Sequence, residues 1–277
     1  ETTSSTISEL YTEIVQEALF VAQEQSIMRG LVRNYTIAGG GKSVEVPIYG
    51  TVSAAAVSEA SDLSNTAVNP TSKTITASEV GIMTTLTDLA RNSASRNVGA
   101  DIGRLFGEAI AKKIDTDLTA LFDGFSTSIG GAGTELTIDN IFKAVATLRQ
   151  ANVPAPYFGV FNPKVIYNVK KSLTNTFVNP NAGDLQNEAM RTGFIGEIAG
   201  VRIFESSNVD GTTDTDNCKG AVFSQDALGL AMMQDLKIES QRDASLRADE
   251  IVASAVYGVG ELHDSYGIEM LNESVIN

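Results

Sequence analysis

The segment from Thr51 to Glu79 constrains the fold of this chain more than any other part of the sequence. Of its 29 residues, 17 are Ala, Ser or Thr, and none is aromatic. Ordering each residue costs roughly 1–2 kcal/mol of conformational entropy, and the few large aliphatic side chains bury too little apolar surface to offset that cost. These side chains are Val52, Val57, Leu63, Val68 and Ile75. The segment is therefore expected to be ordered by something outside itself.

Strand-like sequence lies on both sides of this segment. Residues 43–51 and residues 80–86 alternate apolar and polar side chains, which is the two-residue period of a half-buried strand. Pro47 has no amide hydrogen to donate, which favours an edge strand, and Asn69 and Pro70 are turn formers. The sequence thus predicts a long two-legged hairpin whose tip extends about 50 Å from its base, at roughly 3.3 Å per residue.

Two amphipathic helices are predicted on either side of this hairpin. The clearer one covers about residues 93–122, with apolar side chains along one side and charged side chains along the other. At about 1.5 Å per residue it would be roughly 45 Å long, well above the average helix. The other helix begins at a capping box at Thr6 and ends near Gly30. It can be read as a docking arm or as an ordinary first helix.

The second half of the chain indicates an α/β subdomain followed by another long hairpin. Thr137 and Asn162 are placed to cap helices, and residues 157–161, 200–206 and 220–224 read as short strands. Two extended segments then form an antiparallel hairpin over residues 235–261, whose tip carries charges of both signs. The tip residues are Arg242, Asp243, Arg247, Asp249 and Glu250.

Charge and hydropathy argue against two classes of protein. The chain has 20 basic and 34 acidic residues, a net charge of −14, and no run of Lys and Arg that would follow phosphates. Sequence-specific nucleic-acid binding is therefore not expected. No apolar run approaches the length of a membrane span, and the first residues lack the features of a signal peptide. A single cysteine, Cys218, excludes an internal disulfide and suits a cytosolic folding compartment.

Residues capable of catalysis are sparse. The segment Gly41-Lys42-Ser43 matches the end of a P-loop, but Thr36 stands where its first Gly must be, and a strand follows instead of a helix. The only histidine, His263, lies near two carboxylates, which is too few ligands for a tetrahedral metal site. No nucleophile elbow occurs. The sequence therefore predicts no enzyme, no cofactor and no metal.

The order of these parts resembles the major capsid protein of tailed bacteriophages, the Hong Kong 97-type fold, over essentially the whole chain. Residues 44–124 look like the extended loop of that family leading into its spine helix. Residues 198–209 look like its axial-domain strand, and residues 235–260 like its peripheral-domain hairpin. These are patterns of element order and composition, and they include no catalytic fingerprint.

The resemblance implies an α+β fold with four regions. An N-terminal arm would cover residues 1–42 and an extended loop residues 43–80. The peripheral domain, with the spine helix at about 93–122 and the hairpin 235–261, would comprise residues 81–125 and 235–261. The α/β axial domain would comprise residues 126–234 and 262–277. In that family the extended loop lies across a neighbouring subunit, which would order residues 51–79 from outside.

The resemblance also implies a function and partners. Copies of the chain would form pentamers and hexamers of an icosahedral shell around double-stranded DNA, folded and assembled in the bacterial cytoplasm with a scaffold, a portal and possibly decoration proteins. Some family members lock their shells with a Lys–Asn bond, but the tip has no Asn to pair with Lys73. A long N-terminal scaffold segment is also absent, which implies its cleavage or a separate scaffold. The expected subunit contacts are Val57, Leu63, Val68, Lys73, Arg242, Asp243, Arg247, Asp249 and Glu250.

Two other functions are left open by the sequence. An encapsulin-type nanocompartment shares the fold but encloses cargo enzymes, and packaged DNA would distinguish the two. A secreted surface-layer or adhesin protein would explain the low charge and the Ser/Thr content, but it calls for a secretion signal. The charged hairpin tip also has a simpler interpretation as a solvated turn.

Overall fold

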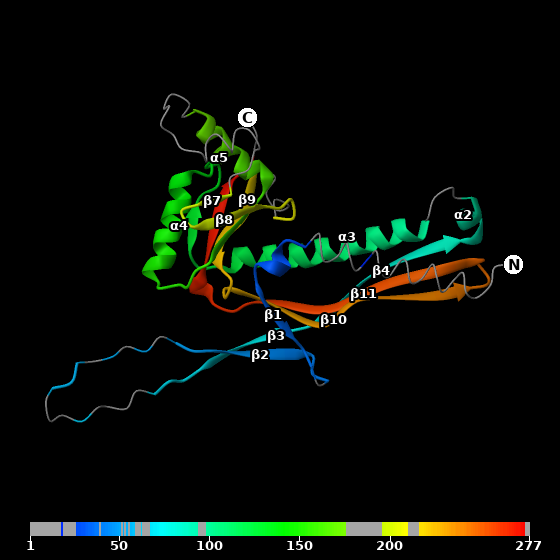
Figure 1. The fold of residues 1–277 in the computed structure, drawn as a ribbon, viewed down its shortest axis with the longest axis horizontal. Helices are drawn as coiled ribbons and strands as arrows, with labels where there is room; N and C mark the ends of the chain where they lie inside the picture. The colour runs from blue at the N-terminus through cyan, green and yellow to red at the C-terminus, as the bar shows by residue number, and fades with distance from the viewer. Residues whose placement is uncertain are drawn as a thin grey trace.

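The computed structural model describes residues 18, 26–38, 40–50, 52, 54, 56–58, 62, 67–93, 98–175, 196–209 and 216–274. Three sheets and four α-helices organise these residues (Figure 1). The six-stranded sheet lies at one end of the long sheet, so the two follow one another along the longest dimension of the molecule. A two-stranded hairpin lies below the long sheet in Figure 1.

The long sheet has the strand order β1-β10-β11-β4. Strand β10 pairs antiparallel with β11 from Leu228↔Glu261 to Asp243↔Ala248, and β4 continues the antiparallel order on the other side of β11. Strand β1 pairs parallel with β10. The predicted second hairpin is therefore confirmed, and it forms the centre of this sheet. The strands are β1 (Arg33–Thr36), β4 (Ser78–Thr87), β10 (Leu228–Asp243) and β11 (Ala248–Glu261).

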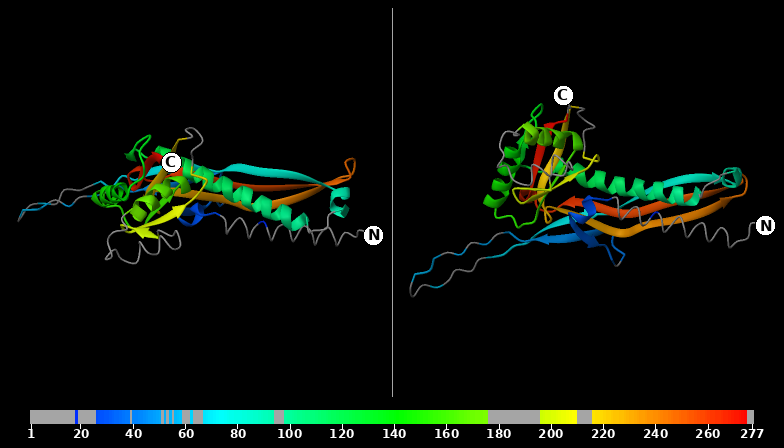
Figure 2. Two further views of the ribbon diagram at one scale, coloured as in Figure 1. Left: turned by 90° about the horizontal axis from the view of Figure 1, so that it is seen from above. Right: turned by 45° about the horizontal axis from the view of Figure 1, so that its top comes forward.

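One long helix, α3 (Val98–Thr119), runs along one face of this sheet in every view (Figure 2). Its buried side chains recur every three or four residues and share one core with the alternating inward side chains of β11. Tyr257 of β11 also donates a hydrogen bond to the carboxylate of Asp117 in α3 (2.8 Å). The same carboxylate forms an ion pair with Lys113, one turn earlier in α3, at 2.6 Å. The core side chains are Phe106, Ile110, Ile114, Leu118, Ile251, Ala253, Ala255 and Tyr257.

The six-stranded sheet has the order β5-β12-β9-β6-β8-β7. Side chains of α4 and α5 form a core with one face of this sheet, while Phe158 and Phe223 on the other face join the core of α3. Thr137 accepts a hydrogen bond from Asn140 N at the start of α4, and Asn162 accepts one from Lys164 N at the start of α5, so both predicted caps are confirmed. The elements are β5 (Ser128–Gly130), α4 (Ile138–Gln150), β6 (Tyr157–Phe161), α5 (Pro163–Asn175), β7 (Glu197–Ile198), β8 (Val201–Glu205), β9 (Asn217–Ser224) and β12 (Gly267–Glu273).

The base of the predicted first hairpin consists of β2 (Ser43–Ile48) and β3 (Thr71–Thr76), which pair antiparallel as a separate two-stranded sheet. Pro47 therefore lies in an edge strand, as its missing amide hydrogen predicts. Residues 49–70 connect the two strands. The expected reach of about 50 Å falls partly outside the described residues and stays a prediction.

The predicted helix over residues 93–122 is confirmed over α3 and is wrong at its C-terminal end. A short helix that the sequence did not predict, α2 (Asp88–Ser93), begins where Thr87 accepts a hydrogen bond from Ala90 N (3.2 Å). Residues 94–97 lie outside the described residues. Helix α3 gives way at its C-terminal end to the 3₁₀ helix η2 (Ala120–Gly124), which ends at a glycine. The predicted helix from Thr6 to Gly30 lies mostly outside the described residues, and the chain forms a 3₁₀ turn, η1 (Met28–Gly30), where that helix was expected to end.

Two expected region boundaries fall inside strands of the long sheet, and one whole strand of this sheet was assigned to another region. The boundary at residues 234/235 lies within β10, because the pairing of β10 with β11 extends back to Leu228. The boundary at 80/81 lies within β4, and β1 belongs to this sheet although it was assigned to the N-terminal arm. With these corrections the division into arm, loop, peripheral domain and axial domain stays a proposal.

A buried carboxylate ties the segment before η1 to α3. Asp115 is 1% exposed and accepts hydrogen bonds from Ser26 Oγ (2.8 Å), Ile27 N (3.1 Å) and Met28 N (3.2 Å). Burial raises the pKa of Asp115, and these donors oppose that shift. The carboxylate therefore satisfies one buried and two partly buried donors, which would otherwise lack these partners.

Asp115→Ala is expected to lower the free energy of unfolding by about 3 kcal/mol, since hydrogen bonds to a charged group contribute about 1.5–3 kcal/mol each and the orphaned donors stay at least partly buried. Urea denaturation of the purified chain measures this change. The exposed Lys112 on the same helix provides the control, because Lys112→Ala should change stability by less than about 0.5 kcal/mol. Equal effects of the two substitutions would contradict the anchoring role.

Candidate assembly surfaces

The first candidate surface is the loop segment, defined as residues 49–70. Every described residue from Tyr49 to Thr74 is exposed, and Figure 1 shows the described part lying away from both larger sheets. Its large apolar side chains are between 48% and 64% exposed. Apolar side chains left uncovered by their own chain favour contact with another molecule. They are Tyr49, Val52, Val57 and Val68.

Three of the four predicted loop contacts are exposed in the structure. Val57 and Val68 belong to this exposed set, and Lys73 is exposed in β3, opposite Val46 of β2. Leu63 lies outside the described residues. Tyr49 was missed by the sequence analysis, although an aromatic residue directly after a strand and before a segment without aromatics is a usable signal.

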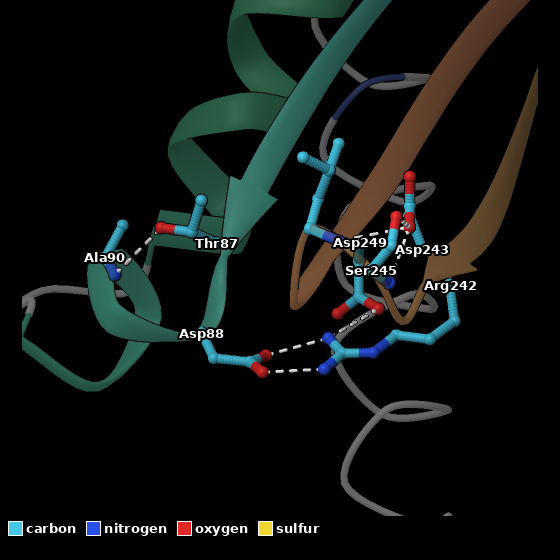
Figure 3. A network of polar contacts seen from close by, with 8 residues as sticks. Thr87, Asp88, Ala90, Arg242, Asp243, Ser245 and Asp249 are labelled. Atoms are coloured by element: carbon cyan, nitrogen blue, oxygen red, sulfur yellow. Dashed lines mark hydrogen bonds and ion pairs between the residues drawn. The ribbon is translucent and has the colours of Figure 1, made fainter.

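The second candidate surface is the tip of the β10–β11 hairpin together with α2 (Figure 3). The guanidinium of Arg242 donates to both carboxylate oxygens of Asp88, at 2.8 Å and 2.6 Å, in a bidentate ion pair. Arg242 also donates to Asp249, its cross-strand partner, at 3.3 Å. These contacts raise the pKa of Arg242 further above its usual value. The pair fastens the start of α2 to the hairpin.

A compact turn closes this hairpin. One oxygen of Asp243 accepts hydrogen bonds from Ser245 N (2.8 Å), Ser245 Oγ (2.7 Å) and Leu246 N (3.2 Å), which lowers the pKa of Asp243. Arg247 has a left-handed backbone (φ 51°), and its carbonyl accepts a hydrogen bond from Asp88 N at 3.0 Å. The turn and α2 therefore form one structural unit.

The sequence of residues 70–268 matches the family model described as phage capsid protein. The chain belongs to the phage capsid protein family. The matched region begins at the last residue of the loop segment and contains α3, the hairpin tip, all of the long sheet except β1, and all of the six-stranded sheet except most of β12. Comparison with curated protein sequences finds no match.

Solved structures resemble this phage capsid protein over most of its length. The capsid structure of the cyanophage P-SCSP1u has a TM-score of 0.72 and 21% identity, covering 89% of this chain and 88% of that one. Mycobacterium phage Che8 has a TM-score of 0.68 and 23% identity, covering 83% and 84%. A virus-like particle from Pyrococcus furiosus has a TM-score of 0.66 and 12% identity, covering 94% and 98%. The predicted α+β, Hong Kong 97-type capsid fold is thereby confirmed.

In this phage capsid protein the predicted tip charges have different environments. Arg242, Asp243 and Asp249 have partners within their own chain, so they hold the tip together whatever else they contact. Arg247 is exposed and Glu250 is half-buried. Their role in contacts between subunits stays a prediction.

Sequence reasoning missed three residues at the tip. Asp88 lies 154 positions before the arginine that it binds, and no local pattern reveals so distant a pair. Leu89 is 79% exposed in α2, and Leu246 is exposed in the turn. A leucine between polar turn residues was the available signal for Leu246.

Asp264 and His263 both contact other residues of the capsid protein. Asp264 accepts hydrogen bonds from Ser126 N (2.7 Å) and Ser126 Oγ, and the His263 ring stacks on Tyr266 with 4.4 Å between centroids. Over the residues that the structure describes, no group of three or more His, Cys, Asp and Glu side chains could hold a metal ion. In the same residues, no helix combines the length and apolar character needed to cross a membrane.

Proposed function

We propose that this capsid protein binds copies of itself head to tail and forms the pentamers and hexamers of an icosahedral shell that encloses double-stranded phage DNA. The observation that carries this proposal is the loop segment, whose apolar side chains are exposed on a chain that otherwise buries a large core. A neighbouring subunit that received the loop segment would bury those side chains. The expectation that a neighbour orders all of residues 51–79 is wrong for residues 71–79, which comprise β3, the start of β4 and the residue between them, and which bury Ile75 and Ala77 within their own chain. Contacts between different patches of identical subunits close into rings and shells.

Small side chains suit the loop segment for this contact. Ala, Ser and Thr allow two backbones to approach closely, and they lose little rotamer freedom on docking. Family membership and the likeness to capsid structures support the same role. The proposed role is therefore structural, without a catalytic step or a cofactor.

The remaining partners follow from the same proposal. A net charge of −14 suits a wall that encloses DNA without gripping its phosphates. Assembly would take place in the bacterial cytoplasm with a scaffold, a portal and possibly a decoration protein, and the product would be the virion capsid. Electron microscopy of purified particles tests whether the protein forms shells. The presence or absence of nuclease-protected DNA in those particles tests whether the shells enclose DNA.

An encapsulin-type shell around cargo enzymes is the second candidate. An encapsulin-type shell has the same fold, so the likeness to a virus-like particle from Pyrococcus furiosus, which extends over nearly all of both chains, does not separate the two candidates. The family match favours the phage capsid. Particles that contain protein cargo and no protected DNA would reverse this preference.

The tip provides a prediction about contacts between shell units. If tips of adjacent units meet, Arg247→Glu would place a carboxylate beside Asp249 and Glu250 of neighbouring copies, and shell yield at low salt should fall several-fold. About 0.5 M salt should restore part of the yield, because it shortens the screening length well below 10 Å. Light scattering measures the yield. Arg247→Ala is the control that removes the charge without reversing it, and equal yields for all three proteins would contradict contact at the tip.

A further inference from the structure

The base of the loop hairpin is seated on glycines of the long sheet. Along residues 228–232 of β10 and 257–260 of β11, large side chains alternate with small ones. The large ones, such as Leu230 and Tyr257, join the core of α3, so the small ones face the opposite side of the sheet. The small residues lie directly opposite one another in the pairs Gly229↔Gly260 and Ala231↔Gly258. On this side Ile75 of β3 is 2% exposed. We call these four small residues the glycine seat.

Close approach explains the glycines of the seat. A Cβ atom on Gly260 would lie 2.9 Å from Ile75 Cγ1, and one on Gly229 would lie 2.9 Å from Ile75 Cδ1. A Cβ atom on Gly258 would lie 2.4 Å from the carbonyl oxygen of Thr76. None of these three glycines has a left-handed backbone. A glycine in the interior of a strand makes that strand less stable. The close contact with β3 explains why glycine occupies these three positions, because a larger side chain would clash with β3.

Other contacts close the seat around Ile75. Leu262 and Val46 belong to the same buried cluster. Ala77 N donates a hydrogen bond to Lys42 O at 2.8 Å, so the hairpin is also tied at the end nearest the sheet. At the opposite end, after the pair Ile48↔Thr71, the exposed loop segment begins.

We propose that the glycine seat sets the direction in which the loop segment leaves the subunit, and that this direction is required for the loop to reach its neighbour. The inference rests on the proposed function. A tilt of about 10° at the base would move the end of a roughly 50 Å loop by about 9 Å, which exceeds the tolerance of a packed interface. Gly229, Gly258, Gly260 and Ile75 are thus positioning residues for assembly.

Gly260→Ala tests the seat in the full chain. We expect hydrogen exchange of the β2 and β3 amides to rise at least tenfold in unassembled subunits, and shell yield to fall at least tenfold, while circular dichroism stays unchanged. Gly229→Ala, whose methyl would meet the end of the Ile75 side chain, is the milder second variant if Gly260→Ala is insoluble. Gly30→Ala is the matched control, since no atom lies within 4 Å of its added Cβ.

A compensating substitution distinguishes the seat from general destabilisation. Ile75→Ala removes the atom that a methyl on Gly260 would strike, so the double variant should recover protection and yield relative to Gly260→Ala alone. The same substitution should not rescue Gly258→Ala, whose clash is with the backbone of Thr76. Two results would overturn the proposed role of the glycine seat. One is unchanged amide hydrogen exchange and unchanged shell yield in Gly260→Ala, and the other is equal rescue of Gly260→Ala and Gly258→Ala by Ile75→Ala. Failure of the proposed function itself has a different signature, which is normal assembly after the loop segment is removed.

Discussion

Replacing residues 49–70 by Asn-Gly is expected to abolish shell formation and leave a folded subunit. Ile48 and Thr71 are the last paired residues of β2 and β3, so a two-residue turn can close the hairpin there, and Asn-Gly favours the required turn type. The residues removed are exposed wherever the structure describes them. Their loss should therefore cost the subunit little stability while it removes the contact with the neighbour.

Sedimentation velocity and circular dichroism separate these two effects. The variant should retain the secondary structure of the parent chain and sediment as subunits at concentrations where the parent forms particles. A variant with Val57→Ser and Val68→Ser keeps the length of the loop and should assemble with an intermediate yield, because it removes apolar contact area alone. Normal particles from the Asn-Gly variant would refute the assignment of the loop segment.

Phe122→Ala is expected to lower the free energy of unfolding by about 3–5 kcal/mol, the usual cost of deleting a buried aromatic ring. Phe122 is fully buried in η2, and its ring centroid lies 5.5 Å from that of Phe223 in the six-stranded sheet and 6.4 Å from that of Phe125. It shares one core with the side chains of α3 and the long sheet. The substitution therefore opens a cavity where the two sheets meet.

Denaturant unfolding of the unassembled subunit measures this loss. Phe142 on α4 offers a matched control, because it is more than half exposed and the same Phe→Ala change should cost under about 0.5 kcal/mol. We also expect Phe122→Ala to unfold in two transitions where the parent unfolds in one, since the shared core couples the sheets. A loss below about 1 kcal/mol would show that Phe122 does not join them.

Local signals in the sequence predicted much of the fold. The caps at Thr137 and Asn162, the apolar run of β6 and the alternation of β11 each specify an element through its own residues. Element order then supported the resemblance that the family match confirms. Such features are predictable because helix caps and strand periodicity depend on near neighbours.

The features that sequence reasoning missed depend on distant contacts. Strand β1 has four residues and no apolar alternation, and it is defined by parallel pairing with β10 nearly 200 positions later. The bidentate pair of Asp88 with Arg242 likewise joins residues that lie 154 positions apart in the sequence and meet at one end of the long sheet. The glycine seat left a signal in the alternation of large and small residues in Tyr257-Gly258-Val259-Gly260, but only the packing of Ile75 explains it.

Electron cryomicroscopy of assembled particles tests most directly whether a neighbouring subunit orders the loop segment. We predict that residues 49–70 lie across the adjacent subunit, with the side chains of Tyr49, Val57 and Val68 buried there. Particles in which these residues fold back on their own chain, or protein that stays a 29.3 kDa monomer at every concentration, would contradict this prediction.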